Sequence, residues 1–231
     1  MKQILLCILF TCFFTATNAQ EETMQLSDFN KLSVTTNIKM ELIKSDETKM
    51  EIEIIKGDRS ELKIEENGKH LKVYIKGKNK WGGSKTKAKL KLYFTELDDI
   101  SVGASARVFS DDVIKSDDFD ADVSSSGSLN LSVEANSLDS DISSSATLEI
   151  KGACNSVDIN VSSSGSFKGA YLKTKTADLN ATSSGSIKIW VTESIEANTS
   201  SSGSIKYKGS PSIKDIDRSI SGGSIKSIDN N

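Results

Sequence analysis

The sequence is poor in the residues that interrupt strands or perform acid–base catalysis. Its 231 residues include one proline, Pro211, and one histidine, His70. Proline cannot donate a hydrogen bond to a strand ladder, so its scarcity favours long uninterrupted strands. His70 follows a predicted turn, and a single histidine in a chain with many serines does not identify a Ser–His–acid triad. Histidine-based catalysis is therefore not indicated.

Cysteines and long apolar runs are also scarce. Residues 1–19 combine Lys2, a short apolar run and small residues ending at Ala19, which is typical of a cleavable export signal. Cleavage after Ala19 would remove Cys7 and Cys12. The remaining Cys154 could form no intramolecular disulfide, and we expect it to be a small buried residue at a corner.

Two further absences limit the partners. No later apolar run reaches the roughly 18 residues that a membrane helix needs. The chain has a net charge of −3 and only three arginines, which does not favour a nucleic-acid partner. We therefore predict an exported protein of the periplasm, the outer-membrane surface or the extracellular space, without a transmembrane helix.

What the sequence has in abundance is a serine-rich repeat. The stretch VSSSGSLNL at 123–131 returns in related form at 142–150, 161–169, 181–189, 199–207 and 220–228. The central glycine or alanine recurs every 18 to 20 residues, and apolar residues alternate with polar ones between the hinges. This period predicts an all-β fold, a single-stranded β-helix or β-solenoid with coils of about 19 residues.

Each serine-rich segment is predicted to be a hinge between strands. Uninterrupted alternation would point Val123, Ser125 and Gly127 inward, and Ser124 and Ser126 outward. Small residues suit a narrow end, and glycine tolerates the positive φ that a corner often needs. Stacked about 4.8 Å apart, the serines would form hydroxyl ladders.

Two columns of outward residues are predicted to run along the solenoid. The strand before each hinge contributes an acid, namely Asp120, Asp139, Asp158, Asp178, Glu196 and Asp217. The strand after each hinge contributes Asn130, Glu149, Lys168, Lys188, Lys206 and Lys226. Stacked carboxylates repel one another, and two explanations remain open: solvent, salt and nearby lysines offset the repulsion, or calcium bridges neighbouring coils through Asp120, Asp139, Asp158 and Asp178.

The chain divides into a signal peptide at 1–19, an N-terminal β region at 20–99 and the regular repeats at 100–231. The N-terminal region also alternates, and we expect it to stack on the repeats within the same domain. Its segment 76–89 surrounds Trp81 with lysines, including Lys78, Lys80 and Lys85. These four residues are a candidate glycan site, and a long solvated hairpin loop is the alternative.

Several motifs resemble those of a known family. The stretch ISVGASARV at 100–108, the recurrent hinge, IKYKGSPSI at 205–213 and a final SGGSI at 221–225 resemble the head GIN domain, an autotransporter adhesin head found in exported proteins of Bacteroidetes-type bacteria. The resemblance covers about residues 29–228. It implies a right-handed β-helix-like fold without assigned catalytic residues.

The combined prediction is a non-catalytic binding or structural module of the cell envelope. Its ligand would be a glycan or another envelope component, and its oligomeric state stays open. The alternative is a carbohydrate-active β-helix enzyme that uses a carboxylate or calcium site, because two coils can place a pair of acids at a suitable separation.

Overall fold

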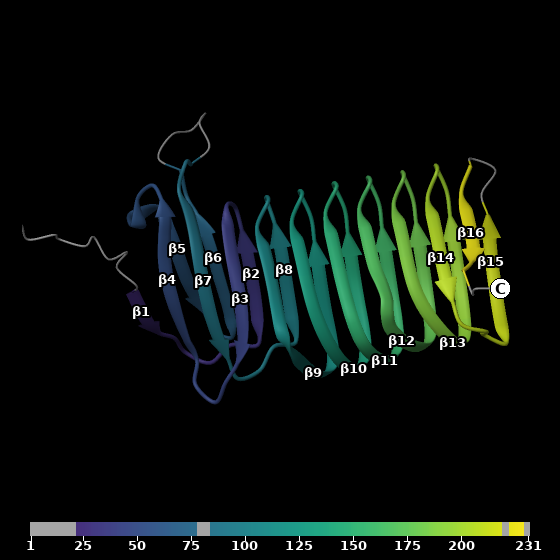
Figure 1. Cartoon of the computed structure of the whole chain (residues 1–231), viewed down its shortest axis with the longest axis horizontal. Helices are drawn as coiled ribbons and strands as arrows, with labels where there is room; N and C mark the ends of the chain where they lie inside the picture. Colours follow the sequence, from purple (N-terminus) through teal and green to yellow (C-terminus); the bar gives the residue numbers. More distant parts are fainter. Residues whose placement is uncertain (1–21, 78–83, 219–221, 229–231) are drawn as a thin grey trace, which may run out of the picture.

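The chain folds into an elongated β-solenoid of about six turns (Figure 1). The computed structural model describes residues 22–77, 84–218 and 222–228, so the predicted signal peptide at 1–19 lies outside the described residues. Within these ranges, no helix is long and apolar enough to cross a membrane. The predicted all-β solenoid is confirmed.

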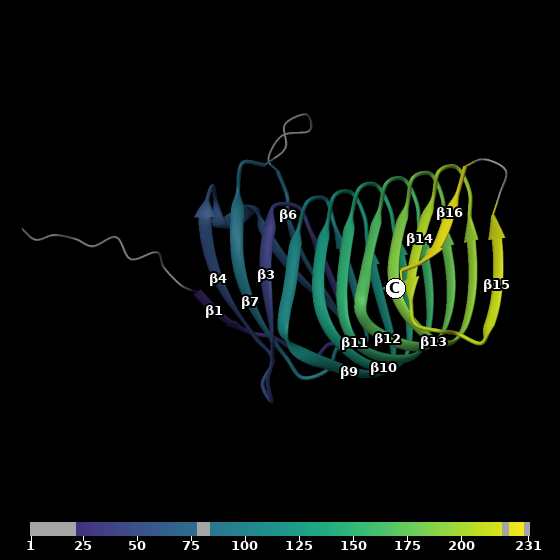
Figure 2. The ribbon, with the colours of Figure 1, turned by 45° about the vertical axis from the view of Figure 1, so that its right-hand side comes forward.

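Each regular coil is one long strand that bends, as Figure 2 shows. The regular strands are β9 (Arg107–Val123), β10 (Ser128–Ile142), β11 (Thr147–Val161), β12 (Ser166–Ala181) and β13 (Ser186–Thr199). The last coils contain β14 (Ser204–Lys208), β15 (Ile213–Arg218) and β16 (Ser224–Ser227). We call the strand halves that follow the hinges, such as 128–133, the post-hinge wall, and the halves that precede them, such as 138–142, the pre-hinge wall.

The N-terminal strands continue the same stack. β2 (Lys31–Thr35) and β3 (Ile38–Lys44) pair in parallel with β8 (Asp99–Gly103) and β9. On their other side, β6 (His70–Ile75) and β7 (Lys87–Phe94) pair in parallel with β2 and β3. The expectation that the N-terminal runs stack on the regular coils therefore holds for these strands.

Antiparallel strands end the stack at the N-terminal side. β4 (Lys49–Lys56) pairs with β7, β1 (Glu22–Gln25) with β4, and β5 (Leu62–Asn67) with β6, while the 3₁₀ helix η1 (Arg59–Glu61) joins β4 to β5. The turn predicted before His70 lies between β5 and β6, where Gly68 has a φ of 60°. The regular coils and this end belong to one sheet.

The core is a set of apolar columns that run along the solenoid. One column contains Leu129, Leu148, Phe167, Ile187 and Ile205, at most 1% exposed and aligned by strand pairing. Cys154 also lies in the core, as predicted, and its burial raises the pKa of the thiol to about 11. The protonated thiol is thus a packing residue, because the thiolate is the reactive form.

The hinges differ from the sequence-based expectation. The left-handed residues are two consecutive serines, as in Ser125 (φ 50°) and Ser126 (φ 61°), and Gly127 is not in that region. Ser125 is exposed, so the predicted inward position is wrong. The Gly127 amide donates to the Ser124 carbonyl at 2.8 Å, which closes a tight turn, and the Ser126 amide donates to Ser144 of the next hinge at 3.0 Å. These bonds hold serine in a conformation that non-glycine residues seldom adopt.

Glycine is needed at those hinges where the neighbouring coil comes very close. A Cβ on Gly127 would lie 2.7 Å from the Val102 carbonyl oxygen, and one on Gly203 would lie 1.9 Å from that of Ala181. Ala146 occupies the same position in another hinge, where it is buried. The space for a methyl group therefore differs from hinge to hinge.

We expect Gly203→Ala to lower the free energy of unfolding by about 2 kcal/mol, because overpacking forces the backbone to shift. Gly127→Ala, with its longer contact, should cost less. Urea-induced unfolding followed by circular dichroism measures both. As a control, Ala146→Gly should cost no more than about 1 kcal/mol. Wild-type stability of Gly203→Ala would contradict the close approach.

The left-handed hinge serines lead to a second prediction. Ser164 has a φ of 63°, which is strongly unfavourable for a β-branched residue. We expect Ser164→Val to lower the free energy of unfolding by about 1–3 kcal/mol and Ser164→Gly to cause no such loss. The same urea unfolding measurement compares the two variants, and equal losses in both would show that backbone conformation is not the cause.

Candidate functional site

A continuous acidic column occupies the pre-hinge wall. Strand pairing aligns Asp99, Asp120, Asp139, Asp158, Asp178, Glu196 and Asp215. The predicted alignment of Asp120 through Glu196 is confirmed. The predicted last member, Asp217, is wrong, because Asp217 pairs with Asn198. Asp215 lies seven residues before Gly222, the same offset that separates Glu196 from Gly203.

The acidic column carries electrostatic strain. Burial, and then repulsion from Asp158, Asp120 and Asp141, raises the pKa of Asp139. Burial followed by repulsion from Asp178 and Asp141 does the same to the pKa of Asp158. At the N-terminal end of the column, the Lys31 ammonium lies 3.2 Å from the Asp99 carboxylate. This lysine relieves the end of the column.

The acidic column does not gather ligands as a metal centre does. Within the part of the chain that the structure describes, no group of three or more His, Cys, Asp or Glu residues could hold a metal ion. Each coil contributes one carboxylate to the column, so Asp120, Asp139, Asp158 and Asp178 form a single file. Calcium bridging between coils stays a prediction from the sequence.

His70 lies at the start of β6 and contacts a serine. Its Nε2 atom is 2.9 Å from the Ser33 hydroxyl, and both residues are half-buried. In the described ranges, no carboxylate accepts a hydrogen bond from the other ring nitrogen of His70. The pair therefore lacks the orienting acid of a catalytic triad.

A basic column runs along the post-hinge wall. Strand pairing aligns Lys168, Lys188, Lys206 and Lys226 after Asn130 and Glu149, which confirms the predicted register. All four lysines are exposed. Neighbouring strands lie about 4.8 Å apart, so the column presents a regular series of positive charges.

Two aromatic residues lie beside this column. Trp190 follows Lys188 by two residues and Lys208 follows Lys206 by two, so each pair shares the outer face of its strand. The Lys208 ammonium lies 4.2 Å from the centroid of the Trp190 ring and 5.3 Å from that of Tyr171. Lys173 lies 5.5 Å from the Trp190 ring, and Tyr171 is 77% exposed.

We call this surface the lysine–aromatic face. It consists of Lys168, Lys188, Lys206, Lys226, Tyr171, Lys173, Trp190 and Lys208. The sequence pattern did not predict that Tyr171 belongs to this face. The pairing between β12 and β13 shifts between Gly169 and Lys173, and this shift interrupts simple alternation. The outward position of Trp190 beside Lys188 could have been predicted from the sequence. Both residues alternate with the buried Ile187, Ile189 and Val191.

The candidate loop from the sequence is only partly described. Lys78, Lys80 and Trp81 lie outside the described residues, and Lys85 is exposed just before β7. Near it, the Thr86 hydroxyl donates to the Glu61 carboxylate at 2.7 Å. The structure therefore does not test the proposed glycan contacts of Trp81.

The acidic column yields a pH-dependent prediction. The pKa of Asp139 in the folded state is raised above its ordinary value of 3.8. In the pH window between these two values, the folded state therefore holds more protons on Asp139 than the unfolded state does. Stability therefore falls as the pH rises through the window. We expect Asp139→Asn to raise the melting temperature by about 2 °C near neutral pH, and this gain should vanish once the pH is below 3.8.

Scanning calorimetry at both pH values measures this gain. Asp46→Asn, an exposed loop acid outside the column, is the matched control and should not change the melting temperature. A gain from Asp139→Asn that persists at low pH would contradict the ionised Asp139 carboxylate as its cause.

Solved structures share this fold. A putative adhesin from Bacteroides fragilis has a TM-score of 0.76 and 22% identity, over 92% of this chain and 98% of that one. A putative adhesin from Parabacteroides distasonis has a TM-score of 0.71 and 20% identity, over 90% of this chain and 96% of that one. A protein from Parabacteroides distasonis described as a putative lipid binding protein has a TM-score of 0.71 and 24% identity, over 93% and 98% of the two chains.

The sequence comparison identifies the family. None of the curated proteins matches the sequence. A family model described as "Putative auto-transporter adhesin, head GIN domain" matches residues 28–211, most of the solenoid and its N-terminal end. Together with the hinge repeats and the solenoid that they form, this match shows that the chain belongs to the head GIN domain family of adhesin-type proteins.

Proposed function

We propose that the protein is a non-catalytic, adhesin-type module exported to the cell envelope, and that its lysine–aromatic face binds an acidic glycan. The observation that carries this proposal is the exposed Tyr171 beside Trp190, with Lys208 over both rings. Export is supported by the signal-like residues 1–19 and by the family.

The chemistry of the face suits a charged sugar chain. Aromatic rings offer flat apolar surfaces with a polar edge, against which the apolar face of a sugar ring can pack. The column of four lysines supplies cations for carboxylate or sulfate groups that follow one another along a polymer. Because a long ligand can contact several coils at once, weak individual contacts add up to useful affinity.

The opposite wall supports an oriented mode of binding. The acidic column would repel a polyanion, whereas the lysine–aromatic face would attract it. The attraction acts between exposed charges, so it should weaken as salt is added. An acidic glycan should therefore approach the post-hinge wall.

We expect polygalacturonate, immobilised on a biosensor, to bind the protein, and uncharged dextran to bind much less. Trp190→Ala should lower the affinity about tenfold, through loss of ring packing and of the Lys208 contact. Lys188→Gln combined with Lys206→Gln should lower it further and reduce its dependence on salt.

Two variants serve as comparisons. Lys72→Gln removes an exposed lysine of β6, on the wall that carries the acidic column, and should leave the affinity unchanged. Trp81→Ala tests the loop predicted from the sequence. If the Trp190 and lysine variants bind with full affinity, the lysine–aromatic face is not the glycan site. If only Trp81→Ala loses affinity, the glycan site lies in the loop.

A further inference from the structure

A hollow with a basic lining opens at the N-terminal end of the post-hinge wall, near the hinges. Its volume is about 530 Å³, and it lies between β3, β7, the end of β4 and the start of β9. The charged residues that line it are Lys39, Lys87, Lys89 and Arg107, and no carboxylate among the described residues does so. We call this cavity the basic hollow.

Strand pairing brings three of these cations together. Lys39 of β3 pairs with Lys89 of β7 on one side and with Arg107 of β9 on the other. Their side chains point outward, because each alternates with buried neighbours such as Met40, Leu90 and Val108. Because the neighbouring strands that carry them lie only about 4.8 Å apart, the three cations repel one another, and a bound anion would relieve this repulsion.

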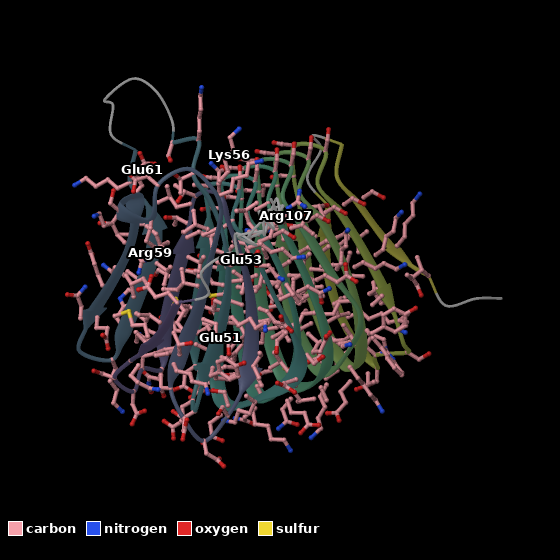
Figure 3. All side chains as sticks on the ribbon, turned by 60° about the vertical axis from the view of Figure 1, so that its left-hand side comes forward. Glu51, Glu53, Lys56, Arg59, Glu61 and Arg107 are labelled. Carbon is pink, nitrogen blue, oxygen red and sulfur yellow. The ribbon has the colours of Figure 1, made fainter. Side chains whose placement is uncertain are left out.

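The nearby acids neutralise only part of this charge. The Lys89 ammonium lies 3.8 Å from the Glu53 carboxylate, and Lys91 lies 3.2 Å from Glu51. Figure 3 shows Lys56 and Arg107 closer to the hinge end of the molecule than Glu53 and Glu51. Within the described ranges, Arg107 forms no ion pair, and Lys39 lies over the Phe109 ring at 5.3 Å. The positive charge thus remains at the hinge side, where the hollow opens.

The hollow also has an apolar contact surface. Ile55 lines it and is 57% exposed, one of the few large apolar side chains exposed in the described residues. The pairing of β4 with β7 shifts between Ile54 and Lys56, so that Ile54 packs against the core while Ile55 faces solvent. A ligand with a carbon chain could cover Ile55 while its anionic group contacts the cations.

We propose that the basic hollow binds an anionic amphiphile, namely a phosphate monoester or phosphodiester headgroup that carries an alkyl chain. The Arg107 guanidinium would bind the phosphate oxygens, since its paired donors match their geometry, and Lys39 would add a second positive charge. The alkyl chain would lie against Ile55. The volume is within the range of small-molecule sites, and no residue of the hollow belongs to the lysine–aromatic face.

Isothermal titration of the protein with three probes tests this site. The probes are octyl phosphate, inorganic phosphate and the uncharged octyl glucoside, each below its micelle concentration. We expect octyl phosphate to bind more tightly than inorganic phosphate, and octyl glucoside to bind far more weakly than octyl phosphate. Arg107→Gln and Lys39→Gln should each weaken octyl phosphate binding about tenfold.

Further variants separate the two parts of the ligand. Ile55→Ser should weaken the binding of octyl phosphate and leave that of inorganic phosphate unchanged. Lys72→Gln changes an exposed lysine outside the hollow and should leave the affinities for octyl phosphate and inorganic phosphate unchanged. Lys206→Gln, in the lysine–aromatic face, should also leave both affinities unchanged, which distinguishes the two surfaces. Thermal unfolding of each variant verifies that it is folded.

Vesicles identify the source of the headgroup. Sedimentation with phosphatidylglycerol vesicles, compared with phosphatidylcholine vesicles, shows whether the hollow accepts a headgroup that is part of a membrane. Arg107-dependent binding to phosphatidylglycerol assigns the ligand to a lipid surface, and Arg107-dependent binding to octyl phosphate alone assigns it to a free amphiphile. Unchanged octyl phosphate affinity in folded Arg107→Gln and Lys39→Gln, or equal binding of octyl glucoside, would overturn the proposal.

Discussion

Parallel backbone pairing between successive coils is the constraint on which the rest of this structure depends. Each coil repeats the path of the one before it, so a residue lies beside its counterpart in the next repeat, as Leu129 lies beside Leu148. Inward positions thereby become apolar columns that exclude water along the solenoid. The hinge obeys the same constraint: the carbonyl of Ala181 occupies space that a side chain at position 203 would need.

The same pairing concentrates charge on the surface. One acid per coil becomes the column from Asp99 to Asp215, and one lysine per coil becomes the column from Lys168 to Lys226. The two columns lie on different walls, so the solenoid presents acids on one side and cations with aromatic rings on the other. In the proposed function, an extended ligand would contact this repeated surface, which needs no deep cleft.

The N-terminal end is built from antiparallel strands instead of parallel coils, and there the surface forms a hollow instead of a column. The antiparallel strands β1, β4 and β5 terminate the stack and cover backbone groups that an open coil would expose. They also bring the end of β4 beside β7, which places Ile55 near Lys87 and Lys89. The basic hollow therefore arises where the regular coils meet the strands that end them.

By itself, the sequence determined the period, the alternation and therefore the solenoid, together with the columns through Asp139 and Lys188 and the burial of Cys154. These follow from local patterns, because repetition at a constant spacing aligns equivalent residues. Only the tertiary structure decided that serines rather than glycine take the left-handed conformation, that Tyr171 lies beside Trp190 and Lys208, and that Lys89, Lys39 and Arg107 form one row. Each of these depends on a hydrogen-bond register or a close approach between segments distant in sequence, and alternation within one strand carries no information about which neighbour it will meet.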